Sequence, residues 1–243
     1  MIGYWIVIAM IACAVTAVIV ASAADHSDQA DPDSSTPSSR PIVIAALGAS
    51  DATGEGASDP ERENWVAQLA EQLPATVHVQ SLGVGGSWLA AAYEIQVPKA
   101  IALEPDIVIG WLIVNDLTQG ESLTHYLKVF GQTLAALTRP GRTVLFANSP
   151  QLWNLPAFIG DPDDIEELRR EVDTWNMGLS QVAASYGAII VDLSQNPVEV
   201  EDLSDDGFHP STAGHAKLAA TFRPHVLSAI EAVQIARGGE LTA

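Results

Sequence analysis

Three side chains in this sequence have the types and the spacing that nucleophilic catalysis needs: Ser50, Asp206 and His209. Ser50 lies in a short turn, residues 47–51 (LGASD), in which a glycine lets the chain turn tightly and lift the hydroxyl out of a sheet. Asp206 precedes His209 by three residues in the segment 206–210 (DGFHP), so its carboxylate can turn back and hold the imidazole. A serine hydroxyl needs a nearby base, and the base needs an acid that orients it. We therefore predict Ser50 as the nucleophile, His209 as its base and Asp206 as the orienting acid.

Two further segments could supply hydrogen-bond donors for the negative oxygen that forms during acyl transfer. Residues 81–87 (SLGVGGS) are rich in glycine, and backbone N–H groups there, that of Gly86 in particular, could face an oxyanion. Asn115 closes a very apolar run, where it either caps the strand end and the following turn or points its amide into a site. The predicted oxyanion hole consists of the Ser50 N–H, the Gly86 N–H and the Asn115 side chain.

Tryptophan and histidine side chains outside these segments are weaker candidates. Trp88 and Trp153 follow predicted strand ends, so we predict that they line the substrate pocket. A dinucleotide-binding fingerprint starting at Gly83 fails because Trp88 occupies its third glycine position. A zinc site built on His209 and His215 lacks a clear third ligand, and the expected enzyme uses no metal and no cofactor.

Apolar runs alternate with helical patterns along most of the chain, and these elements must position the four segments. The predicted strands cover residues 42–47, 77–82, 107–114, 143–148 and 188–192, and the predicted helices cover residues 65–73, 122–137, 165–186 and 212–233. Strands that alternate with helices indicate an α/β fold, with a mainly parallel five-stranded sheet covered on both faces. In such sheets functional groups gather at the carboxyl ends of the strands, where three of the four segments lie.

The N-terminal part of the chain differs in composition from the rest. Residues 2–24 carry no charged side chain, and this length of apolar chain can span a bilayer. Residues 1–24 are therefore expected to be either a signal peptide, cleaved near the small residues 21–23 (ASA), or an uncleaved membrane anchor. Residues 25–41, rich in Asp, Ser and Pro, predict a flexible polar linker. The catalytic domain is expected over residues 42–237 and a C-terminal tail over 238–243, with the domain secreted or anchored outside the cytoplasm.

The composition restricts the partners and the chemistry of the domain. The formal net charge is −19 in 243 residues, and such an acidic surface repels phosphate backbones and anionic lipid. We expect no nucleic-acid partner, and membrane contact only through the N-terminal segment. The one cysteine, Cys13, lies in the N-terminal apolar run, so the folded domain is expected to have no disulfide, no thiolate nucleophile and no cysteine-based zinc site.

Taken together and in this order, the four segments resemble the GDSL/SGNH hydrolase family over nearly all of the predicted domain. Ser50 matches the serine block of the family, Gly86 its glycine block and Asn115 its asparagine block. Asp206 and His209 match its Asp-x-x-His block. The resemblance implies a three-layer α/β/α sandwich of the flavodoxin-like type and ester hydrolysis without a cofactor.

Three positions depart from the family pattern, and none of them removes a catalytic group. Ala49 replaces the aspartate of Gly-Asp-Ser, and Ser81 stands where the glycine block often has asparagine. Ile113 stands two residues before Asn115, where the asparagine block usually has glycine. Because its branched side chain narrows the space beside the predicted donors, we expect Ile113 to line the substrate pocket and to favour small acyl groups.

The leading interpretation is an exported serine hydrolase that cleaves the ester of a small molecule, a lipid or a carbohydrate. An acyltransferase would use the same acyl-serine but pass the acyl group to a sugar or lipid hydroxyl instead of water. From a different functional class, a non-catalytic, membrane-tethered binding module could keep the same fold. The intact set of Ser50, Asp206 and His209 argues against that module.

Overall fold

The computed structural model describes residues 40–240 of the chain. The predicted signal peptide or anchor and nearly all of the predicted linker lie outside the described residues, as do residues 241–243. In the described part, no helix combines the length and the hydropathy that crossing a membrane would require.

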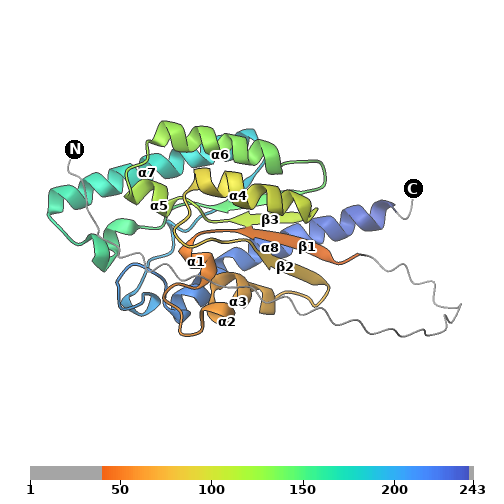
Figure 1. Ribbon diagram of the computed structural model, residues 1–243, viewed down its shortest axis with the longest axis horizontal. Helices are drawn as coiled ribbons and strands as arrows, with labels where there is room; N and C mark the ends of the chain where they lie inside the picture. Colours follow the sequence, from red (N-terminus) through yellow and green to blue (C-terminus); the bar gives the residue numbers. More distant parts are fainter. Residues whose placement is uncertain (1–39, 241–243) are drawn as a thin grey trace, which may run out of the picture. The chain divides into compact units, whose positions relative to one another are not determined.

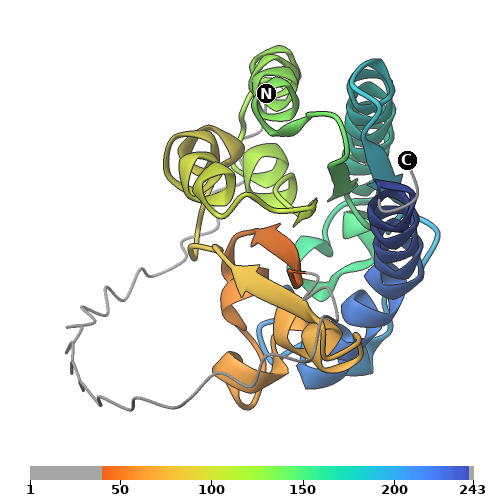
Figure 2. The ribbon, with the colours of Figure 1, turned by 90° about the vertical axis from the view of Figure 1, so that its right-hand side faces the viewer.

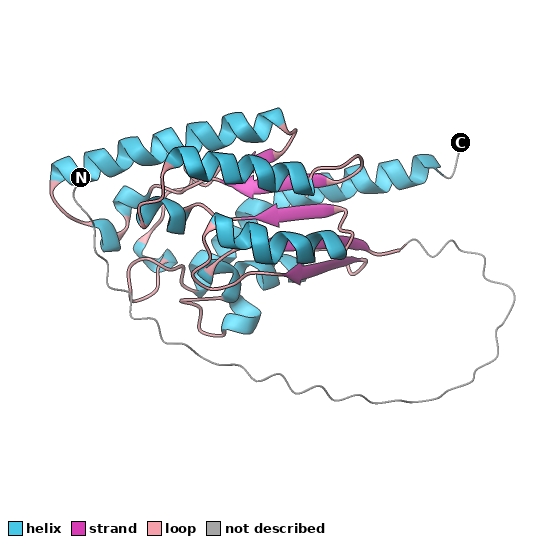
Figure 3. Cartoon of the chain, turned by 45° about the horizontal axis from the view of Figure 1, so that its top comes forward, coloured by secondary structure: helices cyan, strands magenta, loops and turns pink. Residues whose placement is uncertain are grey.

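A five-stranded parallel sheet forms the centre of the domain, as Figure 3 shows. Its strands are β1 (Ile42–Leu47), β2 (Val77–Ser81), β3 (Ile107–Gly110), β4 (Thr143–Ala147) and β5 (Ile189–Val191). They lie side by side in the order β2-β1-β3-β4-β5, and every neighbouring pair is parallel. This order confirms the predicted α/β fold and is that of the flavodoxin-like doubly wound sheets.

Helices cover both faces of the sheet. They are α1 (Ser50–Thr53), α2 (Pro60–Glu63), α3 (Trp65–Glu71), α4 (Leu89–Ala102), α5 (Val114–Thr118), α6 (Leu123–Leu137), α7 (Pro162–Ser185) and α8 (Thr212–Glu240). Three single turns of 3₁₀ helix, η1 (Leu152–Asn154), η2 (Pro156–Phe158) and η3 (Val200–Asp202), lie in the loops. Helices α4, α6 and α7 pack on one face, and α3 and α8 pack on the other (Figures 1 and 2).

The alternation of side chains along β1 explains this three-layer arrangement. Ala45 and Leu47 point into the apolar core under α4, α6 and α7, whereas Ile44 and Ala46 point into the core under α3 and α8. Successive residues of a strand face opposite sides of the sheet, so a strand buried on both faces is apolar at every position. That is why β1 has the continuous apolar sequence from which the sequence analysis predicted it.

The structure corrects three predicted elements. Helix α4, Leu89–Ala102, was not predicted, because Pro98 interrupts its sequence and a glycine-rich segment precedes it. Strand β3 ends at Gly110, four residues earlier than predicted, because the backbone turns at Ile113 (φ −133°, ψ −34°) and enters α5. Helix α8 continues to Glu240, so residues 238–240 belong to a helix and not to a tail.

The order of the strands brings the predicted catalytic segments to one place. From β1 the chain crosses to β2 on one side, and it then returns past β1 to β3 on the other side. The connections that follow β1 and β3 therefore diverge, which leaves a crevice beyond the carboxyl ends of these two neighbouring strands. Ser50 follows β1 and Asn115 follows β3 at this edge.

Candidate active site

Ser50 begins α1 directly after the turn that ends β1. A Cβ atom at Gly48 would lie 2.5 Å from the Cβ of Ala52, so only glycine permits this close turn. Asp51, which is buried, accepts hydrogen bonds from the Ala49 N–H at 3.1 Å and from the Trp65 indole N–H at 2.7 Å. Burial raises the pKa of Asp51 to about 6, although these hydrogen bonds oppose the rise. The carboxylate next to the serine thus supports the turn through its hydrogen bonds to Ala49 and Trp65.

Ser50, His209 and Asp206 form a continuous hydrogen-bonded chain. Ser50 Oγ lies 3.0 Å from His209 Nε2, and His209 Nδ1 lies 2.6 Å from Asp206 Oδ2. The loop before α8 carries both the acid and the imidazole to the serine at the end of β1, across 159 residues of sequence. The structure therefore brings together the three residues that the sequence analysis selected.

The second carboxylate oxygen of Asp206 organises the loop around the histidine. Asp206 Oδ1 accepts the N–H groups of Phe208 at 2.8 Å and His209 at 2.9 Å, and the Ser204 hydroxyl at 2.8 Å. Burial opposes ionisation of Asp206, but the hydrogen bonds from the His209 ring, Phe208 and Ser204 outweigh it and lower the pKa of Asp206 to about 2. The carboxylate is therefore ionised at neutral pH, as the partner of an imidazole that takes up a proton must be.

Asn115 lies in the first turn of α5 and beside the serine, rather than at the end of a strand. Its Nδ2 donates to the Ser87 carbonyl at 3.0 Å, which fixes the plane of the amide. Asp116 holds α5 against the start of α4, because its Oδ2 accepts the Leu89 N–H at 2.9 Å. Gly86 directly precedes Ser87 and has a φ of +71°, in the region that favours glycine.

Gln96 of α4 connects these segments, and the sequence analysis missed it. Its Oε1 accepts the Gly48 N–H at 3.0 Å, and its Nε2 donates to the Gly48 carbonyl at 2.9 Å and to Ser87 Oγ at 3.2 Å. Gln96 is fully buried. It therefore connects the turn before Ser50 to Ser87, whose carbonyl accepts the hydrogen bond from Asn115. The signal in the sequence is an amide between the apolar residues Ile95 and Val97, which is also common on exposed helix faces.

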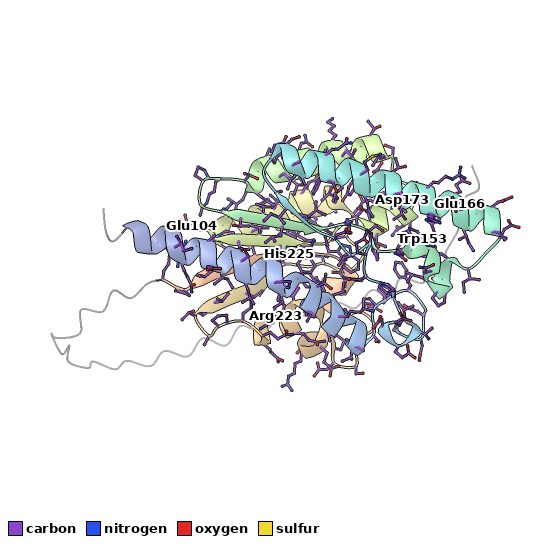
Figure 4. The ribbon with its side chains drawn as sticks, turned by 180° about the vertical axis from the view of Figure 1, so that it is seen from behind. Glu104, Trp153, Glu166, Asp173, Arg223 and His225 are labelled. Atoms are coloured by element: carbon purple, nitrogen blue, oxygen red, sulfur yellow. The ribbon has the colours of Figure 1, made fainter. Side chains whose placement is uncertain are left out.

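A pocket that is open to solvent lies beside Ser50 and His209. Its walls include Asn115, Ile113 and Ser87, and apolar side chains from the loops after β3 and β4. The two predicted tryptophans do not line it, because other contacts hold them. The Trp88 indole N–H donates to Gln119 at 3.2 Å, and Trp153, labelled in Figure 4, packs 5.8 Å from the guanidinium of Arg169. Pro150, Leu152 and Leu155 are the residues that form the wall on the β4 side instead.

Among the described residues, no three His, Cys, Asp or Glu side chains converge as metal ligands would. His215 is buried, and its Nε2 lies 3.1 Å from the Glu55 carbonyl oxygen. Burial lowers the pKa of His215, which favours the neutral ring inside the fold. It therefore supports the loop that follows Ser50 rather than offering a second metal-binding imidazole beside His209.

Residues 46–217 match the family described as GDSL-like lipase/acylhydrolase. Solved structures share the fold: TesA is 21% identical, over 77% of this chain and 99% of its own, with a TM-score of 0.61. The acetyl xylan esterase AlAXEase is 14% identical, over 76% of this chain and 100% of its own, also with a TM-score of 0.61. The esterase EstA from Pseudoalteromonas sp. is 15% identical, over 78% and 98% of the two chains, with a TM-score of 0.62. No individually curated protein matches the sequence.

Proposed function

Because this chain belongs to the GDSL-like lipase/acylhydrolase family and is a hydrolase of the esterase class, we propose that it cleaves its substrate through an acyl-serine formed on Ser50. The observation that carries the proposal is the 3.0 Å distance between Ser50 Oγ and His209 Nε2, continued by the 2.6 Å distance to Asp206. At these distances the imidazole can accept the serine proton while the carboxylate stabilises the ring as it becomes charged.

In the first half of the proposed reaction, Ser50 Oγ attacks the ester carbonyl carbon and His209 Nε2 takes the hydroxyl proton. The tetrahedral intermediate then breaks its bond to the alkoxy oxygen, which leaves as the alcohol with the proton from His209. In the second half, water attacks the acyl-serine and gives its proton to His209. Release of the carboxylic acid returns the proton to Ser50.

The proposed oxyanion hole consists of the Ser50 N–H, the Gly86 N–H and the side-chain amide of Asn115. An amide nitrogen carries two N–H groups, and the hydrogen bond to Ser87 uses one of them. The position of Asn115 in the pocket wall supports a role for the other group toward the carbonyl oxygen of the ester. Donors fixed before the reaction stabilise the developing charge without reorganisation.

Asn115→Ala should lower kcat by about 10²–10³-fold and leave KM nearly unchanged, because the oxyanion carries its charge only as the tetrahedral state forms. Steady-state kinetics on p-nitrophenyl acetate and thermal unfolding measure the two effects separately. If Asn115 only fixes the turn at Ser87, the variant should lose about 0.5–2 kcal/mol of unfolding free energy and keep its kcat.

Gln96→Leu should lower kcat by roughly 10–100-fold with little change in KM, because the Gly48 N–H loses its acceptor, the Gly48 carbonyl keeps only the Val84 N–H, and the turn that positions Ser50 moves. Val97→Ala is the matched control, since Val97 is the next residue of α4, is buried and has no side-chain atom that could hydrogen-bond to the Gly48 turn. Equal kcat values for the two variants, at similar thermal stability, would show that Gln96 only stabilises α4.

A fluorophosphonate probe provides the direct test of the proposed nucleophile. The probe should label the purified protein at Ser50, and labelling should stop when a slowly hydrolysed ester competes for the site. Failure to label an enzyme that hydrolyses p-nitrophenyl acetate would exclude an activated serine. A time course with an added acceptor alcohol distinguishes hydrolysis, which releases the free acid, from acyl transfer, which forms a new ester.

We also propose that the acyl group is small. Ile113 is buried and forms part of the pocket wall next to Asn115, which supports a short acyl side. The relative named an acetyl xylan esterase is consistent with a short acyl group, and it indicates nothing about the alcohol of this chain's substrate. Acetyl esters should therefore be hydrolysed with a higher kcat/KM than octanoyl esters of the same alcohol.

The place of action is a further proposal, which rests on the charge-free segment Ile2–Ala24 of the sequence. We propose that the catalytic domain works outside the cytoplasm, either secreted or held at the membrane by this segment. Sequencing the N-terminus of the mature protein distinguishes the two forms, because cleavage would give a start near Asp25. A cytosolic protein that keeps Met1 would contradict both.

A further inference from the structure

A second cavity adjoins the catalytic pocket and shares part of its wall. Trp111, Leu155 and Phe208 line both cavities. From there the second cavity continues between the loop after β5 and helix α8, where Val198, Leu203 and Leu218 contribute its lining, and it opens to solvent. None of these last three residues lines the catalytic pocket.

This cavity lies on the histidine side of the site. Phe208 and Pro210, the two chain neighbours of His209, lie in the wall that it shares with the catalytic pocket. The Phe208 ring stands edge-on to the imidazole, with the ring centroids 4.9 Å apart. The imidazole must return its proton to the departing alkoxy oxygen, so the alcohol part of an ester faces His209, whereas the carbonyl oxygen faces the oxyanion donors. A group that extends from the alkoxy oxygen past His209 therefore approaches the second cavity.

The polar groups around the cavity leave few hydrogen bonds for a ligand. Lys217 Nζ donates to Asp202 and to the Pro197 carbonyl, and Asn196 Nδ2 donates to Thr221 at 3.1 Å. The buried indole Nε1 of Trp111, which has no partner among the described residues, is the exception and can still donate one hydrogen bond. A sugar ring would leave several hydroxyl groups unpaired here, at a cost of about 1–3 kcal/mol each, whereas a hydrocarbon group would gain from burial.

We infer that the second cavity binds the alcohol part of the substrate, and that this alcohol is a bulky, mainly apolar group. The inference rests on the proposed esterase mechanism and narrows its substrate class to short-chain esters of such alcohols. The bond that breaks lies between the acyl carbon and the alkoxy oxygen. The alcohol leaves with the proton that His209 took from Ser50. Water then supplies the hydroxyl of the acid and, through His209, the proton that returns to Ser50.

The test compares two acetate esters of primary alcohols, ethyl acetate and 2-cyclohexylethyl acetate, which differ in apolar bulk while the acyl group stays the same. The wild-type enzyme should hydrolyse the cyclohexylethyl ester with a kcat/KM about tenfold or more higher, because each buried methylene contributes about 0.8 kcal/mol. As a measure that needs no variant, 2-cyclohexylethanol should inhibit hydrolysis of ethyl acetate competitively and far more strongly than ethanol does.

Val198→Trp should fill the cavity and bring the ratio of kcat/KM for the cyclohexylethyl ester to that for ethyl acetate from about tenfold to within about twofold. Val200→Trp is the matched control, since Val200 follows two residues later, is 76% exposed and lines neither cavity. A wild-type enzyme without a preference, or a Val198→Trp variant that loses both activities equally, would overturn the inference. Hydrolysis of ethyl acetate that depends on Ser50 would still support the esterase mechanism in that case, whereas its absence would contradict the mechanism itself.

Discussion

Ser50→Ala is expected to give a folded protein whose kcat for ester hydrolysis is lower by about 10⁴-fold or more. The alanine removes the atom that lies 3.0 Å from His209 Nε2, so no acyl-enzyme can form. The change removes one half-buried hydroxyl and keeps the backbone of the turn, for which Asp51 and Gln96 provide the hydrogen bonds. Thermal unfolding should therefore stay close to that of the wild type.

The measurement is kcat on p-nitrophenyl acetate, together with fluorophosphonate labelling of the same preparations. Ser185→Ala is a suitable control, since Ser185 ends α7 and its hydroxyl only donates to the Gln181 carbonyl within the helix. This control should keep both activity and labelling. A Ser50→Ala variant with more than a tenth of the wild-type activity would place the nucleophile at another residue.

The sequence predicted best those elements whose local pattern of residues is compatible with only one kind of structure. A run that is apolar at every position, such as β1, has to be buried on both faces, and this led to the parallel sheet. Ser50, Asp206 and His209 were selected because the proposed chemistry depends on residue types that rarely occur together in this order, and the structure brings them within hydrogen-bonding distance. Their distances could not be predicted, since they depend on how the loop before α8 folds back onto the end of β1.

The residues that were missed or misplaced depend on tertiary contacts that leave a weak trace in the sequence. Gln96 is fully buried because its two polar atoms match the N–H and carbonyl of Gly48, which lies 48 positions away. The same amide on an exposed helix would look identical in the sequence. Trp88 and Trp153 follow strand ends as predicted, but contacts with Gln119 and Arg169 hold them outside the pocket wall.

Asp206→Asn should lower kcat by about 10³–10⁴-fold and leave the fold intact. Asparagine keeps an oxygen that can accept the three hydrogen bonds now made to Oδ1, from Phe208, His209 and Ser204. Its amide nitrogen, however, would face His209 Nδ1, where the carboxylate now accepts at 2.6 Å. A donor at this place favours the tautomer whose proton is on Nε2, and that nitrogen then cannot accept the serine proton.

The pH dependence of stability and of the rate separates the role of Asp206 toward His209 from a purely structural role in the loop. The pKa of Asp206 in the folded protein is about 2, below the ordinary value of 3.8, so its contribution to stability is present above about pH 4 and is lost as the pH falls through about 2. Between pH 5 and 9 the carboxylate stays ionised, so a change of kcat/KM within this range does not come from titration of Asp206. Asp206→Ala provides the contrast, because it removes Oδ1 as well and should lower the thermal unfolding temperature together with the rate. If Asp206→Asn loses stability to the same extent as Asp206→Ala, or keeps more than a tenth of the wild-type kcat at pH 8, the carboxylate serves the loop and not the histidine.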